Sequence, residues 1–384
     1  MMQYLKLIII ILLNILLRIF HIFPINRNRI VFTSYYGQQY ACNPKYIFEY
    51  IYKNYGDKYS YVWCLNNEKL FPNEFTKVKI VKYLSFKYIL YLQSSKYCVA
   101  NSHLVPFLNK RKEQIFINTW HGGGAYKKNG VDLKFYSKER KKSIKILLKI
   151  RAKQNPYIIS SCKKFTDFSS KDWEIPISSF LPIGMPRNDI IFSKKIDLKN
   201  KIASQFCIDE NLKIVLYAPT FRGNPQKTED IDITLDTEKL LTAAKKRFKN
   251  DFVIFYRGHF LFNYNYIPEG LIDASSYPDM QELLCASDIL ITDYSSSMWD
   301  FSFTFKPCFI YAPDLKKYQS QQGFYTPIEE WPFPIAESNI ELIKNILQFN
   351  EEKYMINVKK HHIDLGSFEY GTACEQFCRF IFSI

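Results

Sequence analysis

Short apolar runs alternate with amphipathic stretches from about residue 28 to the end of the chain. A first series of predicted strands comprises residues 29–34, 60–65, 78–83, 96–100, 114–119, 157–160 and 180–183. A second series comprises residues 213–218, 252–257, 270–274, 288–292 and 308–312. These runs are almost continuously apolar, which is typical of strands buried on both faces of a parallel sheet.

The stretches between these runs have helical spacing, as at residues 46–54, 85–94, 236–250, 280–286 and 297–304. Two successive series of strands and helices predict an α/β protein with two Rossmann-like domains that face one another, a GT-B-like architecture. We place the domain boundary near residues 186–205, which gives domains of residues 28–190 and 191–384. The last predicted helix, residues 371–384, could belong to either domain.

Residues 1–27 form an apolar N-terminal segment whose uninterrupted core, residues 7–13, is too short to span a bilayer. Its polar side chains share one side of a helical wheel: Lys6, Asn14, Arg18 and His21. This pattern favours a helix that lies in a membrane interface. A secretory signal peptide would need a small-residue cleavage site, which the following residues lack. A buried structural helix is the remaining alternative.

Residues 134–153 contain nine Lys or Arg residues and one Glu. On a helix, Ile144, Leu147 and Leu148 would share one face, whereas the opposite face would carry lysines: Lys142, Lys145 and Lys149. A basic amphipathic helix of this kind binds anionic membrane surfaces. The alternative is an ordinary solvated helix packed on its domain.

The formal net charge of +15 favours anionic partners such as phospholipid or phosphorylated substrates. Nucleic acid is disfavoured, because the sequence contains neither zinc-finger spacing nor an RNP-type aromatic signature. The nine cysteines include no CxxC pair, which indicates reduced thiols in the cytosol and no zinc site. No cofactor is identified, and no carboxylate pair supports a metal site.

The strongest chemical signal follows the predicted strand 114–119, which runs into Trp120-His121-Gly122-Gly123-Gly124. Ligands of doubly wound sheets bind beyond the carboxyl ends of strands, so an imidazole here can act as a base. The HGGG pattern also occurs in esterases, but the G-x-S-x-G elbow that they need is absent. The alternative is a structural histidine in a Gly-rich turn.

A second signal is Asp293 at the end of strand 288–292, followed by three serines at a predicted helix start: Ser295, Ser296 and Ser297. Free N–H groups at a helix N-terminus bind phosphate, although the serines could simply be N-caps. Two further strand ends carry cations, at Arg257-Gly258-His259 and at Thr220-Phe221-Arg222. Together they predict a diphosphate site. Neither a Walker A nor a G-x-G-x-x-G pattern occurs.

The order of several motifs resembles one family, the CDP-glycerol glycerophosphotransferases, which include teichoic-acid primases and polymerases and their ribitol and capsule relatives. The matching stretches are 43–44, 118–122, 184–189, 216–222, 257–259, 279–284, 288–301, 322–325 and 370–373. The resemblance covers residues 28–378, nearly the whole chain. Two departures, Gly123-Gly124 after the first histidine and Phe260 after the second, concern acceptor and donor identity.

The resemblance implies transfer of a polyol phosphate from a CDP-polyol donor, held by the C-terminal domain, to a hydroxyl of a lipid-linked or glycan acceptor, with release of CMP. It also implies peripheral attachment at the cytoplasmic face of the cell membrane. His121 is expected to be the general base, His259 to stabilise charge, and Asp293 to orient His259 or the cytidine ribose. The expected substrate-binding residues are Gly122, Gly123, Arg187, Thr220, Arg222, Arg257, Glu282, Ser295, Ser296 and Ser297.

Two alternatives to this function remain at the level of sequence. A glycosyltransferase of the same architecture would use a nucleotide sugar, because fold alone does not decide function. A non-enzymatic membrane-surface protein that binds anionic polymer would release no CMP from any donor.

Overall fold

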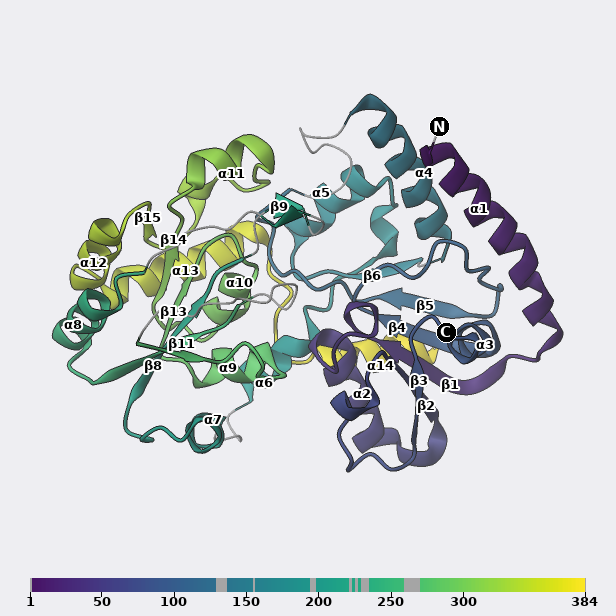
Figure 1. Cartoon of the computed structure of the whole chain (residues 1–384), viewed down its shortest axis with the longest axis horizontal. Coiled ribbons are helices and arrows are strands. Elements are labelled where there is room, and N and C mark those ends of the chain that lie inside the picture. The colour runs from purple at the N-terminus through teal and green to yellow at the C-terminus, as the bar shows by residue number, and fades with distance from the viewer. Residues whose placement is uncertain are drawn as a thin grey trace. The chain divides into compact units, whose positions relative to one another are not determined.

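The computed structural model describes residues 2–128, 137–154, 156–193, 198–220, 223–224, 227–228, 235–258 and 270–383. The chain divides into two compact units. Unit 1 consists of Met1–Gly122, Asn129–Asp189 and Ser367–Ile384, and unit 2 consists of Gly123–Lys128 and Ile190–Gly366. Figure 1 shows the elements of both units with the labels used below.

Unit 1 contains a seven-stranded sheet in the order β3-β2-β1-β4-β5-β6-β7. All its neighbouring strands pair in parallel. The strands are β1 (Asn26–Thr33), β2 (Ser60–Leu65), β3 (Val78–Lys82), β4 (Ser95–Ala100), β5 (Ile115–Asn118), β6 (Tyr157–Ile159) and β7 (Phe180–Leu181). The seven strands predicted for this half of the chain are therefore confirmed. Because β1 is the central strand from which the order runs both ways, the sheet has its switch point between β1 and β4.

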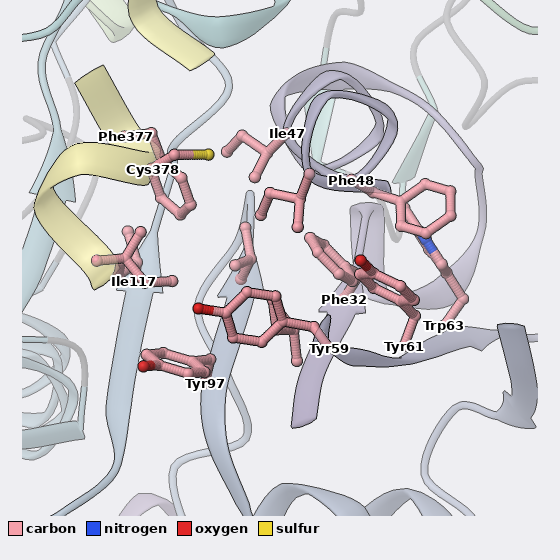
Figure 2. Packing of buried hydrophobic residues seen from close by; sticks show 14 of the residues in the cluster. Phe32, Ile47, Phe48, Tyr59, Tyr61, Trp63, Tyr97, Ile117, Phe377 and Cys378 are labelled. Atoms are coloured by element: carbon pink, nitrogen blue, oxygen red, sulfur yellow. The ribbon is translucent and has the colours of Figure 1, made fainter. Parts of the chain in front are cut away.

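The core of unit 1 lies on both faces of this sheet. The helices of the unit are α1 (Met2–Leu16), α2 (Cys42–Tyr55), α3 (Phe86–Ser94), α4 (Lys138–Gln154), α5 (Lys163–Trp173) and α14 (Ala373–Ser383). On one face, Ile47 and Phe48 of α2 and Phe377 of α14 pack with buried strand residues in one hydrophobic cluster, as Figure 2 shows. On the other face, Phe20 packs with residues of α3 and the strands.

The last helix, α14, is part of unit 1, whereas the expected division placed residues 191–384 in one domain. Phe377, Cys378 and Ile381 are buried in the unit 1 core. The carboxylate of Asp189 accepts hydrogen bonds from the backbone N–H groups of Ala373 and Cys374, at 2.9 and 2.8 Å. An acidic side chain on the first N–H groups of a helix satisfies donors that have no partner within the helix.

Unit 2 contains a six-stranded parallel sheet in the order β12-β11-β8-β13-β14-β15. Its strands are β8 (Lys213–Ala218), β11 (Phe252–Tyr256), β12 (Leu271–Asp273), β13 (Ile289–Thr292), β14 (Cys308–Tyr311) and β15 (Ile335–Ala336), and a separate hairpin joins β9 (Gly223–Asn224) to β10 (Lys227–Thr228). The five predicted strands of the sheet are confirmed, and the prediction of two parallel-sheet domains with them. The switch point lies between β8 and β13.

The helices of unit 2 are α6 (Asp189–Phe192, which begins at the last residue of unit 1), α7 (Leu198–Phe206), α8 (Thr237–Phe248), α9 (Met280–Ala286), α10 (Ser297–Ser302), α11 (Leu315–Gln321), α12 (Asn339–Leu347) and α13 (Glu351–Leu365). Short 3-10 turns occur at Leu17–Ile22, Tyr35–Gly37, Gly56–Lys58, Glu68–Leu70, Ile177–Ser179, Pro186–Asn188 and Ile328–Glu330. The predicted helix at 280–286 coincides with α9, and those at 236–250 and 297–304 are present with ends that differ by one or two residues.

Polar side chains of the N-terminal helix α1 and of the 3-10 turn that follows it contact backbone oxygens of residues 107–109 in the same unit. Asn14 Nδ2 donates to the carbonyl oxygens of Phe107 and Leu108, at 3.2 and 3.1 Å. His21 Nε2 lies 3.3 Å from the carbonyl oxygen of Asn109. Among the α1 side chains that the structure describes, from residue 7 onward, the exposed ones are apolar and include Ile8, Ile11, Leu12, Ile15 and Leu16. Within the described ranges, no helix is both long and apolar enough to cross a membrane.

Candidate active site

The switch point of the unit 1 sheet is held by Asn101, the first residue after β4. Its side chain is fully buried. Nδ2 donates to Ser34 Oγ at 3.1 Å, and Oδ1 accepts from the backbone N–H of Tyr35 at 2.8 Å. Asn101 therefore ties the end of β4 to the end of β1, where ligands of doubly wound sheets bind.

His121 lies three residues beyond β5, and its imidazole is exposed. Its Nδ1 atom is 2.8 Å from the backbone carbonyl oxygen of Asn101. Because a carbonyl oxygen only accepts, this contact requires the proton to be on Nδ1, and the neutral ring then presents its lone pair at Nε2. The rings of Trp120 and Tyr35 lie 4.6 and 5.8 Å from the imidazole. The geometry gives His121 the tautomer that a general base needs.

Arg187 is buried beside His121 rather than exposed at the sheet edge. Its Nη1 atom donates to the backbone oxygen of His121 at 2.9 Å and contacts Cys42 Sγ at 3.4 Å. Its backbone N–H donates to Asn43 Oδ1 at 3.1 Å. These bonds show a positioning role for Arg187, while its expected contact with substrate stays a prediction, as does that of Gly122.

Asn43 completes this arrangement from the N-terminal end of α2. Its Nδ2 atom donates to the carbonyl oxygens of Thr119 and Trp120, both at 3.0 Å. The residue is fully buried. Asn43 therefore fixes the backbone immediately before His121, and Arg187 fixes the backbone of His121 itself.

Gly123 is the first residue of unit 2 after His121 and Gly122. A Cβ atom at Gly123 would lie 2.2 Å from Trp299 Cδ1, so the backbone can approach this indole only at a glycine. Three residues on, Tyr126 Oη lies 3.0 Å from Nε2 of the buried His361. These contacts give Gly123 a packing role, and its expected contact with substrate stays a prediction.

Asp293 lies at the switch point of the unit 2 sheet and is buried. Both of its carboxylate oxygens accept from the backbone N–H of Thr220, at 2.9 Å each. Oδ1 also accepts from the backbone N–H of Tyr294 at 2.6 Å. Asp293 and Thr220 are thus brought together, and Asp293 shapes the loops after both β8 and β13.

The three serines after Asp293 differ in their surroundings. Ser295 Oγ accepts from the backbone N–H of Ser297 at 3.2 Å and from Ser297 Oγ at 2.9 Å. Ser295 thus satisfies the first backbone N–H of α10, although the N-cap position itself is Ser296. Ser296 is partly exposed, and its side chain makes no hydrogen bond within the described residues. Among the three, Ser296 is the hydroxyl that remains available to a ligand.

Arg257 and Glu282 are linked through Tyr277. Arg257 Nη1 donates to the backbone oxygen of Tyr277 at 2.6 Å. The phenol of Tyr277 donates to Glu282 Oε2, which also accepts from Lys201 Nζ at 2.6 Å. Burial and this carboxylate raise the pKa of Tyr277. The expected substrate contacts of Arg257 and Glu282 stay predictions.

Two of the expected site residues, His259 and Arg222, lie outside the described residues. All nine cysteines are free thiols. Within the described residues, no group of three or more His, Cys, Asp or Glu side chains is placed to hold a metal ion.

Sequence reasoning missed Asn101, which sets the tautomer of His121, and it found Asn43 in the matched stretch 43–44 without its role in holding the backbone before His121. The available signal was a polar residue directly after a predicted strand, at 96–100 for Asn101. Their partners are 20 and 76 residues away in sequence, so the contacts themselves follow only from the tertiary structure.

Two parallel sheets of Rossmann-type strand order, each with polar side chains at its switch point, define the class of two-domain, doubly wound α/β enzymes. The model of the CDP-glycerol:poly(glycerophosphate) glycerophosphotransferase family matches residues 15–383. The chain belongs to this family and is therefore a transferase.

Known relatives agree with this assignment. The chain is 31% identical over 378 residues to the teichoic acid poly(glycerol phosphate) polymerase of Bacillus spizizenii, covering 94% of each protein. It is 29% identical over 380 residues to the teichoic acid glycerol-phosphate transferase of Staphylococcus aureus, covering 93% of each. It spans only 47% of the longer Bacillus subtilis polymerase, to which it is 28% identical. A solved structure of the wall teichoic acid polymerase TagF, soaked with CDPG, has a TM-score of 0.81 at 27% identity, covering 94% of this chain and 89% of that chain.

Proposed function

We propose that the protein transfers glycerol phosphate, or a related polyol phosphate, from a CDP-polyol to a hydroxyl of an envelope-polymer acceptor. The observation that carries the proposal is the bond between His121 Nδ1 and the carbonyl oxygen of Asn101, which leaves Nε2 as the proton acceptor. The two relatives above that are covered over more than nine tenths of their length are both named for glycerol phosphate, which favours CDP-glycerol as donor.

In the proposed reaction, an acceptor hydroxyl gives its proton to His121 Nε2 while its oxygen attacks the β-phosphorus of the donor. A new phosphodiester O–P bond forms, and the bond between the β-phosphorus and the bridging oxygen breaks. The electron pair of that bond leaves on CMP. A positioned general base contributes about 10²- to 10⁴-fold to such a step.

The donor would be held by unit 2, where phosphoryl transfer needs chiefly positioning and neutralisation of charge. We assign binding of the donor diphosphate to Ser296 and the adjacent start of α10. His259, Arg222 and Arg257 would neutralise its negative charge. Asp293 would act indirectly, since its carboxylate already holds the two loops at this sheet edge.

We also propose peripheral attachment to the cytoplasmic face of the cell membrane. The exposed row on α1 includes Leu12, Ile15 and Leu16, with 59%, 55% and 65% of their surface accessible. Such a row next to a polar face anchored on the protein fits a helix lying in the interface. On α4, Leu148 is buried and Lys142 is exposed, as the sequence predicted, but Lys145 and Lys149 pair with Glu174 at 3.0 and 3.8 Å. Both lysines are still 52% and 70% exposed, so the attraction to anionic lipid would come from them and from the other basic residues of α4, less the one charge that Glu174 offsets.

A donor panel tests the function. The full chain is incubated with CDP-glycerol, CDP-ribitol and a UDP-sugar, each with lipid-linked and soluble polyol-phosphate acceptors, and CMP release is followed. The proposal expects CMP release that depends on both a CDP-polyol and an acceptor. Release of UDP from the UDP-sugar, with no CMP from either CDP-polyol, would favour the glycosyltransferase alternative.

A further inference from the structure

Two basic side chains close to His121 have buried nitrogen atoms without partners. His103 lies two residues after Asn101, and Arg151 lies in the last turn of α4. His103 Nδ1 and Arg151 Nε are buried and have no hydrogen bond to any residue that the structure describes. Because buried polar atoms are nearly always hydrogen-bonded, such atoms mark a place where a ligand or water completes the bonding.

His103 and His121 contact the same indole ring. The ring of Trp120 lies 4.6 Å from His121 and 6.1 Å from His103. Trp173 packs at 4.7 Å from Trp120 and at 6.3 Å from His103. The two imidazoles therefore flank one aromatic surface at the carboxyl edge of the sheet.

Arg151 is directed toward the same region by the packing of α4. Leu148 and Gln154, three residues before and after it, share its face of the helix. Leu148 is buried, and Gln154 Nε2 donates to the carbonyl oxygens of Pro106 and Leu108, at 2.8 Å each. This face of α4 thus lies against the segment of residues 103–108, which begins at His103.

Arg151 carries the positive charge of this cluster, and His103 is a neutral hydrogen-bonding group. Burial lowers the pKa of His103 to about 3, with further contributions from the charges of Arg151 and His121. Burial also lowers the pKa of Arg151, against a small opposing effect of Tyr36. In the described parts of the chain, no carboxylate forms an ion pair with Arg151, and the nearby Glu174 already pairs with Lys145 and Lys149. An uncompensated buried cation is best satisfied by an anion.

We propose that His103 and Arg151 bind a phosphodiester group of the acceptor, next to the hydroxyl that His121 deprotonates. This assignment rests on the proposed function. A polyol-phosphate acceptor carries an anionic phosphodiester one polyol away from its terminal hydroxyl. Arginine binds phosphate oxygens through two parallel N–H groups, and the partly exposed indole of Trp120, backed by the buried Trp173, offers apolar surface to the intervening carbons.

The test compares wild type, Arg151→Gln and His103→Gln, with Lys171→Gln as the control. Lys171 is an exposed lysine on α5, two residues before Trp173. The acceptor is soluble tri(glycerol phosphate), with its uncharged methyl phosphotriester as second probe. We expect Arg151→Gln to raise the acceptor KM about 10- to 100-fold, because a charge-assisted hydrogen bond is lost. The donor KM should stay within about twofold, and Lys171→Gln should resemble wild type.

Calorimetric titration of the acceptor without donor gives a measurement that does not need turnover. Wild type should bind the anionic probe more tightly than the triester, and Arg151→Gln should remove that difference. The melting temperature of Arg151→Gln should not fall, because the charge that it removes has no partner. If it does fall, Arg151→Lys keeps the charge, and partial recovery of acceptor binding in that variant is the expected result.

The outcomes separate the two proposals. Wild type that releases no CMP with any acceptor contradicts the proposed function. Normal turnover with an unchanged acceptor KM in Arg151→Gln overturns the acceptor subsite alone. A second experiment compares the binding of wild type and Arg151→Gln to phosphatidylglycerol vesicles. If Arg151→Gln loses vesicle binding but keeps its acceptor affinity, the phosphate belongs to a lipid headgroup, and the acceptor subsite is overturned.

Discussion

Arg187 Nη1 donates a hydrogen bond of 2.9 Å to the backbone oxygen of His121, although 66 residues separate the two in sequence. Arg187 is itself fixed through Asn43, which also holds the carbonyl oxygens of the two residues before His121. The chain leaves unit 1 directly after Gly122 and again after Asp189. The bond therefore joins the two places at which the polypeptide departs toward unit 2.

This relationship predicts that Arg187→Met lowers kcat without weakening the binding of the CDP-polyol donor. Methionine has a similar length but cannot hold the His121 carbonyl, so the imidazole should lose its alignment. We expect kcat to fall at least about tenfold, since a misplacement of about 1 Å can cost about 100-fold. A raised donor KM with an unchanged kcat would instead show that Arg187 contacts substrate. Steady-state kinetics with CDP-glycerol distinguishes these results.

His121→Ala should leave the fold intact and remove most turnover. The side chain is exposed, so truncation creates no core cavity, and loss of a general base costs about 10²- to 10⁴-fold. Circular dichroism provides the folding control. His121→Gln is the matched variant, because its side-chain amide can donate a hydrogen bond as the imidazole Nδ1–H does but cannot accept the proton. A folded His121→Ala variant with near-normal kcat would rule out the base assignment.

The fold was largely predictable from sequence because its strands are buried on both faces. Continuous apolar runs identified every strand of the two sheets except β15. That strand has two residues, Ile335 and Ala336, and it directly follows Pro334, so it lacks the continuous apolar run that identified the equally short β7. The place of α14 was open for a related reason. Its amphipathic pattern shows that one face is buried but does not show against which sheet.

The candidate site was predictable only where chemistry is adjacent in sequence. His121 and the serines follow their strands directly, so strand-end reasoning found them. Asn101 acts on His121 through its backbone oxygen, and any residue type would supply that atom. What requires asparagine is its side-chain bridge to Ser34 and Tyr35, which depends on the pairing of β1 with β4.

The serines give a matched pair of variants. Ser296→Val should raise the donor KM with little change in melting temperature, because its hydroxyl has no partner within the described part of unit 2. Ser295→Val should lower stability by about 1 kcal/mol, the usual cost of losing a helix cap. Calorimetric titration with CDP-glycerol and thermal melting measure the two effects. If Ser296→Val binds the donor as wild type does, the hydroxyl is not a ligand for the diphosphate.

His362 should make stability depend on pH. Its ring stacks on Phe303 at 4.2 Å, and burial lowers its pKa to about 4. The folded pKa is thus below the unfolded value of about 6.5, so the unfolded chain binds the proton first. Stability should fall as the pH drops from about 6.5 to 4, by at most about 1.4 kcal/mol per pH unit from this residue. Urea unfolding of His362→Gln should show a shallower loss; an identical slope would contradict this.

The proposed membrane attachment should depend more on the apolar face of α1 than on the paired lysines of α4. Leu12→Ser with Leu16→Ser should weaken binding to neutral and anionic vesicles by about tenfold or more, since each exposed side chain would lose apolar burial. Ile340→Ser, on an 81% exposed isoleucine of α12, is the matched control and should bind as wild type does.

The electrostatic part of the attachment requires separate variants. Lys142→Gln with Lys138→Gln should weaken binding to anionic vesicles only, and salt should reproduce this loss, because the attraction decays within a Debye length of about 8 Å at physiological ionic strength. Lys145 and Lys149 are left unchanged in this experiment. Both pair with Glu174, so replacing them could change the stability of the fold as well as vesicle binding. Vesicle sedimentation of the full chain measures each arm. If the leucine variant sediments as wild type does, α1 is not a membrane element, and its exposed apolar row needs another partner.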